Sequence, residues 1–174
     1  MPEKINVLLS EQVIKKRVAG LADEILSGSR PELLHVVFVL KGSFVFCADL
    51  VRELSRKGQA VNIDYIIAKS YLGTESTGTV KCKIDIDMAG KDILLVEDIV
   101  DTGNTMLKLR KKIAEMKPER LRLVTLLDKP ERREVDIEPD YVGFEVEDRF
   151  LVGYGLDFDE RYRELPYIGV ISPQ

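Results

Sequence analysis

Three carboxylates followed by a turn of small, hydroxyl-bearing residues form the part of the sequence best suited to chemistry. In DILLVEDIVDTGNTM (92–106), an apolar run reaches Glu97 and Asp98, and Asp101 follows. The next four residues, which open a predicted helix, suit an anion site: Thr102, Gly103, Asn104 and Thr105. Backbone N–H groups at a helix N-terminus bind phosphate, and glycine permits close approach of the backbone. Carboxylates beside a phosphate can accept hydrogen bonds from a sugar diol or help to hold Mg²⁺. The pattern therefore predicts a site for a phosphorylated sugar.

The elements that must position these residues alternate between strands and helices. Apolar spacing predicts three helices, at 10–26, 44–57 and 102–116. Apolar runs predict buried strands at 33–40, 61–70, 92–100 and 121–128, and residues 80–86 have strand-like alternation. This order is typical of an α/β fold with a parallel sheet covered by helices on both faces. The last 45 residues lack helical periodicity, and we expect short strands and loops there that flank or cap the sheet.

A second candidate anion site follows from the same topology. Leu40, Lys41, Gly42 and Ser43 end one buried strand and open the next predicted helix. Ligands of open parallel sheets bind beyond the carboxyl ends of the strands, so this turn and residues 101–105 are expected at the same edge. Residues 71–79 are rich in Gly, Ser and Thr, which predicts a mobile loop.

Length and composition indicate one domain and exclude several classes of protein. The chain has 174 residues, a formal net charge of −4 and 45% hydrophobic residues. Two cysteines cannot build a disulfide framework, and a single histidine argues against zinc chemistry. No apolar run approaches the length of a membrane span and no secretory signal is visible, so we expect a cytoplasmic protein with no membrane partner. The acidic balance argues against a nucleic-acid partner.

Five segments resemble one known family, in the order that the family has them. VEDIVDTGNT resembles the phosphoribosyl-pyrophosphate (PRPP) signature of type I phosphoribosyltransferases. Within that family, four further segments resemble the hypoxanthine-guanine branch. They match its pyrophosphate loop, mobile lid, purine-contacting turn and base-binding hood, and they are VLKGSFVF (39–46), KSYLGTESTG (69–78), LLDKPERR (126–133) and residues 140–171. The resemblance implies a single phosphoribosyltransferase domain, with a core over about residues 10–130 and a hood from 131–174 plus the N-terminal end.

The resemblance implies a reaction and a role for each matching residue on the ribose side. Hypoxanthine or guanine and PRPP would give IMP or GMP and pyrophosphate, with Mg²⁺ as cofactor. Asp101 matches the general base that takes the proton from purine N7. Glu97 and Asp98 match residues that contact the ribose hydroxyls, and residues 102–105 match the 5′-phosphate turn. The implied metal ligands are Asp157, Glu97 and Asp98.

On the pyrophosphate and purine sides the resemblance implies further contacts. The turn at residues 40–43 and Arg163 would bind pyrophosphate, and the family often has a non-proline cis peptide at the position of Leu40 and Lys41, which the sequence does not decide. Ser70 and Tyr71 begin the implied lid. The residues implied at the purine are Lys129 at the 6-oxo group, Phe150 stacked on the ring, the backbone of Leu151 at the base edge, and Asp157 nearby. The family also implies a homodimer or homotetramer.

Two other functions stay open at this point. A xanthine-preferring enzyme would use the same chemistry and differ in its contacts to the purine C2 substituent. A PRPP-sensing regulator that binds nucleic acid would keep the fold and need a basic face, against which the net charge of −4 argues.

Overall fold

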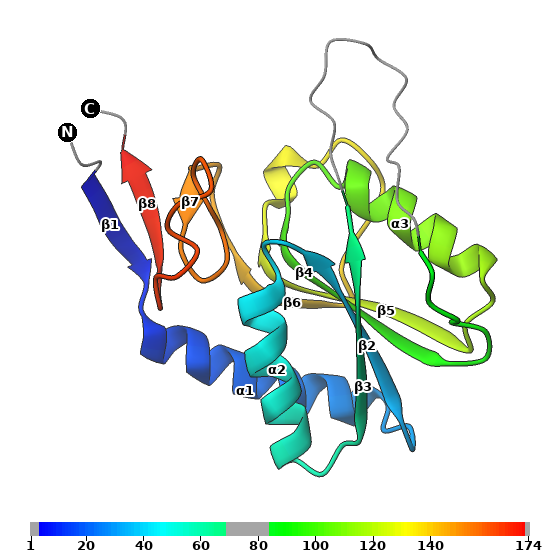
Figure 1. Ribbon diagram of the computed structural model, residues 1–174. Coiled ribbons are helices and arrows are strands. Elements are labelled where there is room, and N and C mark those ends of the chain that lie inside the picture. The colour runs from blue at the N-terminus through cyan, green and yellow to red at the C-terminus, as the bar shows by residue number, and fades with distance from the viewer. Residues whose placement is uncertain (1–3, 69–83, 173–174) are drawn as a thin grey trace.

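The computed structural model describes residues 4–68 and 84–172, which form two sheets and three long helices (Figure 1). In chain order the elements are β1 (Lys4–Leu9), α1 (Glu11–Gly28), β2 (Leu34–Leu40), α2 (Phe44–Arg56), β3 (Val61–Ile67), β4 (Asp92–Val100), α3 (Asn104–Glu115), β5 (Arg120–Asp128), the 3₁₀ turn η1 (Pro130–Arg132), β6 (Tyr141–Glu145), β7 (Leu151–Val152) and β8 (Ile168–Ser172). Ser10 caps α1 as the sequence suggests, since its side chain accepts a hydrogen bond from the Val13 N–H at 3.4 Å.

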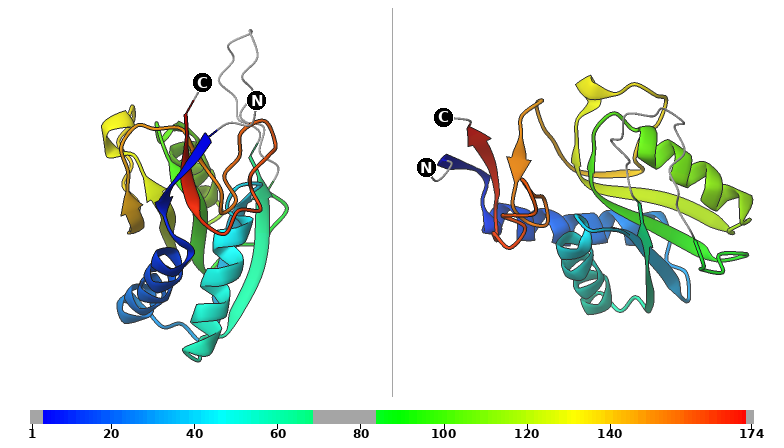
Figure 2. Two further views of the ribbon diagram at one scale, coloured as in Figure 1. Left: turned by 90° about the vertical axis from the view of Figure 1, so that its left-hand side faces the viewer. Right: turned by 45° about the horizontal axis from the view of Figure 1, so that its top comes forward.

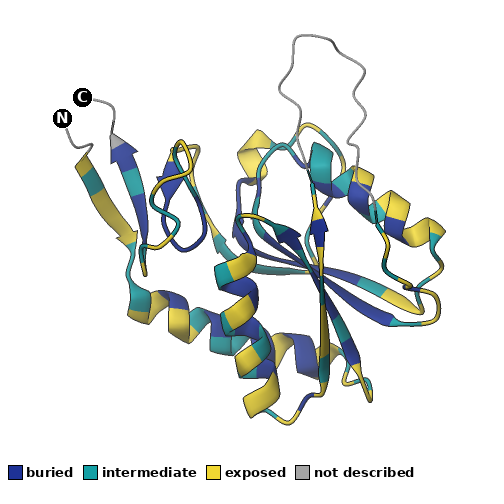
Figure 3. Ribbon diagram, viewed as in Figure 1, coloured by how far each residue is buried: buried dark blue, intermediate teal, exposed yellow. Residues whose placement is uncertain are grey.

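The larger sheet has five parallel strands in the order β3-β2-β4-β5-β6. Successive side chains of a strand point to opposite faces, and each face has its own core. Val36 and Leu94 pack with α1 and α2, whereas Val37 and Leu95 pack with α3. The central strands are accordingly almost entirely buried (Figure 3). The predicted α/β fold with a helix-covered parallel sheet is confirmed.

Two segments differ from the strand pattern that the sequence suggests. Residues 84–86, the described part of the strand predicted at 80–86, belong to no strand. Ile84 and Ile86 instead pack against the core on the α3 face, so their alternation reflects burial against a helix-covered surface without a partner strand. Strand β6 lies in the region expected to flank the sheet, and it joins the larger sheet as an edge strand parallel to β5.

The smaller sheet combines segments from opposite ends of the chain. It has the order β1-β8-β7 and is antiparallel, with Lys4 opposite Ser172. Figure 2 shows it standing beside the larger sheet, so that the first and last described residues lie side by side. No helix in residues 4–68 and 84–172 is long and apolar enough to cross a membrane.

A buried ion pair ties the two central strands together near their amino ends. Arg122 of β5 and Asp92 of β4 are 7% and 8% exposed, and their Nη2 and Oδ1 atoms are 2.7 Å apart. The guanidinium also donates to the Ile25 carbonyl of α1 at 3.2 Å and to the Tyr141 hydroxyl of β6 at 3.4 Å. One charged side chain thus connects three strands and a helix at the end of the sheet opposite the candidate site.

Candidate active site

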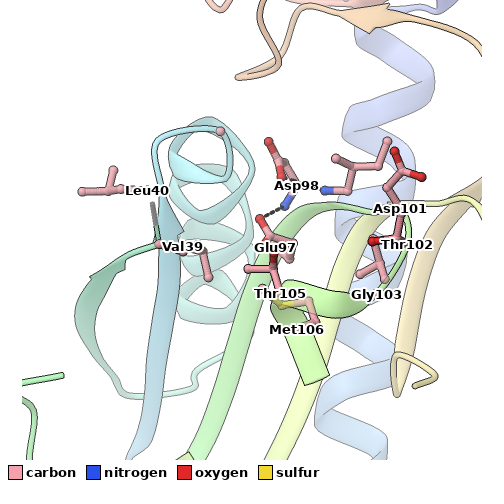
Figure 4. Close-up of a pocket in the computed structure, with 13 residues that line it drawn as sticks. Val39, Leu40, Glu97, Asp98, Asp101, Thr102, Gly103, Thr105 and Met106 are labelled. Carbon is pink, nitrogen blue, oxygen red and sulfur yellow. Dashed lines mark hydrogen bonds between the residues drawn. The ribbon is translucent and has the colours of Figure 1, made fainter. Parts of the chain in front are cut away.

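The turns after β2 and β4 meet at the carboxyl edge of the larger sheet and line an open cavity of about 220 Å³ (Figure 4). From the first turn, Leu40 and Gly42 line it. From the second turn, most of the residues assigned to the ribose and 5′-phosphate line it: Glu97, Asp98, Asp101, Thr102, Gly103 and Thr105. The structure therefore brings the two candidate anion turns together, as the parallel topology predicts.

The two turns approach each other so closely that only glycine fits at position 42. A Cβ atom added to Gly42 would lie 1.6 Å from Oδ2 of Asp98. Within this turn, the peptide bond between Leu40 and Lys41 is cis. The Ser43 side chain is buried and its hydroxyl donates to the Val39 carbonyl, so Ser43 anchors the turn from within.

Glu97 and Asp98 form an acidic pair that is largely shielded from solvent. Glu97 is only 7% exposed, and burial followed by the neighbouring Asp98 charge raises its pKa well above the usual value for glutamate. Burial also raises the pKa of Asp98. The pair is held by its own backbone, since the Asp98 N–H donates to Glu97 Oε1 at 3.0 Å and the Ile99 N–H donates to Asp98 Oδ1 at 2.8 Å. Two carboxylates placed this way favour a ligand that supplies protons, hydroxyl donors or a cation.

The raised pKa of Glu97 predicts that this residue costs stability near neutral pH. When the pKa of a carboxyl is higher in the folded chain than in the unfolded chain, the folded chain becomes less stable as the pH rises from the ordinary glutamate pKa to the raised one. Glu97→Gln keeps the acceptor oxygen and removes the charge, so we expect a higher Tm at pH 7.5 and a smaller gain at pH 4.5. A gain of ~1 kcal/mol corresponds to about 2–4 °C for a chain of this size. Differential scanning calorimetry at the two pH values measures the effect, and a lower Tm at pH 7.5 would contradict it.

The turn before α3 is shaped for an anion by backbone and not by a basic side chain. Gly103 has φ of +85°, and an added Cβ would lie 2.6 Å from Ile137 Cγ2, so glycine is required twice over. The first N–H groups of α3 follow directly and, like those of any helix start, have no acceptor within the helix. Asn104 is turned aside: its Nδ2 donates to Thr102 Oγ1 at 3.2 Å and to Glu134 Oε2 at 2.7 Å.

Asp101 and Lys129 are joined by a chain of ion pairs. Arg132 Nε donates to Asp101 Oδ1 at 3.0 Å, and Arg132 Nη1 donates to Asp148 Oδ2 at 3.2 Å. Lys129 Nζ lies 3.3 Å from Asp148 Oδ1 and donates to the Arg149 carbonyl at 2.8 Å. Lys129 is only 7% exposed, which is rare for a lysine without such partners.

Two of the remaining residues assigned to the purine, Phe150 and Leu151, directly follow Arg149, which Lys129 contacts, whereas Asp157 pairs with Arg163. Phe150 follows Arg149, whose carbonyl Lys129 contacts, and Phe150 is 53% exposed. Its ring meets Phe158 edge-on with centroids 5.3 Å apart. Leu151 is buried at the start of β7. An exposed aromatic ring and a buried ammonium group, linked through the Arg149 carbonyl, offer a stacking surface and a hydrogen-bond donor to a flat polar ring.

A second charged group lies at the first turn. Arg163 Nη2 is 2.9 Å from Asp157 Oδ1 and 3.4 Å from Glu160 Oε1, while Lys41 Nζ is 2.7 Å from Glu160 Oε2. The Lys41 ammonium lowers the pKa of the Glu160 carboxyl. The structure thus groups the residues assigned to pyrophosphate, although they are far apart in sequence.

The charged residues that sequence reasoning missed and that contact assigned ones include Arg132, Asp148 and Glu160. Each lies within three residues of an assigned position, in the charged runs KPERR, EDRF and DFDER. Those charged runs are the only sequence signal for the three residues. The signal is weak, because charged residues that follow a strand are usually solvated. Ser70 and Tyr71, assigned to the lid, lie outside the described residues.

The carboxylates at this edge suit Mg²⁺ only when a substrate completes its coordination. Among residues 4–68 and 84–172, no cluster of three or more His, Cys, Asp or Glu side chains could hold a metal alone. Mg²⁺ prefers oxygen ligands and is usually bound by one or two carboxylates together with water and substrate phosphates. Glu97 and Asp98 at the cavity, together with Asp157, which pairs with Arg163, offer that incomplete set.

A family model and several known proteins match most of the chain. The family model for the phosphoribosyl transferase domain matches residues 5–159. The chain therefore belongs to the phosphoribosyltransferase family.

The similar proteins of this family carry more particular names. The chain is 43% identical to the hypoxanthine phosphoribosyltransferase of Salmonella typhimurium, with 98% of this chain and 97% of that protein covered. It is 46% identical to the hypoxanthine-guanine phosphoribosyltransferase of Aquifex aeolicus, covering 98% and 96% respectively. The crystal structure of a hypoxanthine-guanine phosphoribosyltransferase from Bacillus anthracis superimposes with a TM-score of 0.90 at 44% identity, covering 99% of this chain and all of that one. Within the family, the chain thus groups with the hypoxanthine and hypoxanthine-guanine enzymes.

Proposed function

We propose that this chain is a purine salvage enzyme that transfers the 5-phosphoribosyl group from PRPP to N9 of hypoxanthine or guanine. The bond from ribose C1 to the pyrophosphate oxygen breaks, and the bond from purine N9 to C1 forms, giving IMP or GMP and pyrophosphate. The observation that carries the proposal is the cavity that unites the acidic pair, the turn before α3 and the turn after β2 at one sheet edge. Its chemistry matches a ribose with a phosphate at one end and a diphosphate at the other.

Each group of side chains has a task in this reaction. Residues 102–105 bind the 5′-phosphate with the N–H groups and hydroxyls at the start of α3, while Glu97 and Asp98 accept hydrogen bonds from the ribose hydroxyls. Asp101 takes the N7 proton and so raises the nucleophilicity of N9. Lys41, Arg163 and the backbone of residues 40–43 hold the leaving pyrophosphate. Phe150 stacks on the purine, and Lys129 donates to its 6-oxo group.

Mg²⁺, bound with the substrate, would neutralise charge on the diphosphate as it leaves. Glu97, Asp98 and Asp157 are the residues that would hold it. We extend the proposal to a single catalytic domain whose hood begins near residue 131, to a homodimer or homotetramer, and to a location in the cytoplasm, where a free buried cysteine such as Cys47 is ordinary.

A direct assay tests the proposal. Pyrophosphate release from PRPP and Mg²⁺ is measured in separate tubes with hypoxanthine, guanine, xanthine and adenine. Turnover with the first two is expected. Faster turnover with xanthine than with hypoxanthine or guanine would leave the proposed mechanism intact and change the proposed specificity. Binding of PRPP without turnover by any base would contradict the enzyme reading and favour a regulator, for which salt-dependent binding of nucleic acid is the next measurement.

Replacing Lys129 should weaken the choice of a 6-oxo purine. In Lys129→Gln, a neutral amide replaces the ammonium group, and we expect kcat/KM for hypoxanthine to fall about tenfold to a hundredfold, the value of a hydrogen bond to a charged donor. Discrimination against adenine should fall with it, because adenine presents an amino group to which Lys129 offers only another donor. Steady-state kinetics with hypoxanthine and adenine measure both effects. Exposed Lys111, on α3, gives the control Lys111→Gln. Unaltered selectivity in Lys129→Gln would remove Lys129 from the purine site.

A further inference from the structure

The Glu160 carboxylate contacts both cations that the proposed function assigns to pyrophosphate, Lys41 and Arg163. One carboxylate oxygen, Oε2, is 2.7 Å from Lys41 Nζ, and the other, Oε1, is 3.4 Å from Arg163 Nη2. Lys41 and Glu160 are 119 residues apart in the sequence, so the contact depends on the tertiary fold. The carboxylate therefore bridges two positive charges in the way that an oxyanion ligand would.

The loop around Glu160 is built to keep its carboxylate at that position. Asp159, Glu160 and Tyr162 all have left-handed backbone conformations, with φ of 53°, 61° and 78°. Residues other than glycine rarely adopt these backbone angles, and such conformations persist where surrounding contacts fix the chain. One such contact is the hydrogen bond that the Glu160 N–H donates to Asp157 Oδ2 at 2.9 Å. The Asp157 carboxylate, in turn, binds Arg163 at 2.9 Å.

Arg163 is more firmly placed than Lys41. Its side chain is 19% exposed, and Nη1 donates to the Gly155 carbonyl at 2.8 Å, so its guanidinium stays at the site whatever Glu160 does. Lys41 and Glu160 are 66% and 64% exposed, and both side chains are free to exchange partners with a ligand from solution. A diphosphate that reaches the two cations must take the place of the carboxylate, because the negative charges repel and the contacts coincide.

We propose that Glu160 is an internal competitor of pyrophosphate, which holds Lys41 and Arg163 in the empty site, yields them to the diphosphate of PRPP and takes them back as pyrophosphate leaves. The inference rests on the proposed function, which assigns those two cations to pyrophosphate. It adds a residue to the reaction: Glu160 weakens the binding of the product and so favours its release.

The sign of one effect separates this role from a structural one. If Glu160 is a competitor, its removal tightens the binding of pyrophosphate. If Glu160 only supports Lys41 and Arg163 in a useful arrangement, its removal loosens them and weakens binding. Exposed ion pairs contribute up to roughly fivefold each to an equilibrium, so the loss of two competing contacts should tighten binding about threefold to tenfold.

Isothermal titration of inorganic pyrophosphate with MgCl₂ into the full chain provides the test, using Glu160→Gln and the control Glu164→Gln. Glu164 is exposed and adjacent to Arg163, so its replacement removes the same charge from the same loop without touching the bridge. We expect the Kd of Glu160→Gln to fall about threefold to tenfold and that of Glu164→Gln to stay near the wild type. Product inhibition by pyrophosphate should strengthen by the same factor in Glu160→Gln.

Three results would overturn the inference. An unchanged or higher Kd in Glu160→Gln would assign the residue a structural role. An equal tightening in Glu164→Gln would reduce the effect to net charge. A wild-type chain that neither binds pyrophosphate nor releases it from PRPP would refute the proposed function itself, and the role of Glu160 would fall with it.

Discussion

Asp101→Asn is expected to lower kcat by about 10²-fold or more, the usual contribution of a general base. Asparagine keeps an oxygen that can accept the hydrogen bond from Arg132 Nε, which is 3.0 Å from Asp101 Oδ1, so the turn should keep its shape. It cannot take a proton from purine N7. The affinity for PRPP should change little, because the phosphate and ribose contacts remain. Steady-state kinetics with hypoxanthine, together with titration of PRPP, separate the two quantities.

The exposed Asp136, on the connection between η1 and β6, gives a matched control. Asp136→Asn removes the same charge and should leave kcat near the wild-type value. A normal kcat in Asp101→Asn would refute the assignment of Asp101 as the base. A loss of PRPP affinity that accounts for the whole effect would instead make Asp101 a binding residue.

Asp92→Asn should cost about 3–5 kcal/mol in the free energy of unfolding, the usual effect of removing one partner of a buried ion pair. The change leaves the Arg122 guanidinium buried between β4 and β5 without an opposing charge. Arg122 would keep its bonds to the Ile25 carbonyl and the Tyr141 hydroxyl, which cannot neutralise it. Urea denaturation, followed by circular dichroism, measures the loss as a lower midpoint.

The pair Arg56–Glu53 on α2 is the control, because its side chains are 66% and 23% exposed, against 7% and 8% for Arg122 and Asp92. Glu53→Gln should change the free energy of unfolding by less than about 1 kcal/mol. If Asp92→Asn were as stable as Glu53→Gln, water or local relaxation of the chain would be compensating the Arg122 charge for the loss of its partner. The end of the sheet opposite the cavity would then be more plastic than its packing indicates.

The sequence predicted the elements and the place of the site because both follow from local patterns. Apolar runs located β2, β4 and β5 to within one residue at the site end, and parallel strands bring their carboxyl ends together. The cavity between Leu40 and Thr105 follows from those two facts. Glycine at positions 42 and 103 could be read as a requirement for close approach, and the geometry shows what each one approaches.

What could not be predicted depends on contacts between distant charged residues. Arg132 and Asp101 are 31 residues apart, and Lys41 and Glu160 are 119 apart. Nothing in the types of these residues selects one partner among the many charges of the chain. The strand predicted at 80–86 was wrong over residues 84–86 for a related reason, since alternation records burial on one side and does not record whether a neighbouring strand is available.

The pairing of β1 with β8 has a consequence for the order of folding. Every strand of the larger sheet lies between them in the sequence, so that sheet and its helices can assemble while the partner of β1 is still missing. Closing so long a loop is entropically unfavourable unless the intervening chain is already compact. We therefore expect amides of β1 to gain protection from hydrogen exchange after those of β4 during refolding. The loop between β7 and β8, which contains Arg163, would become fixed at that late step.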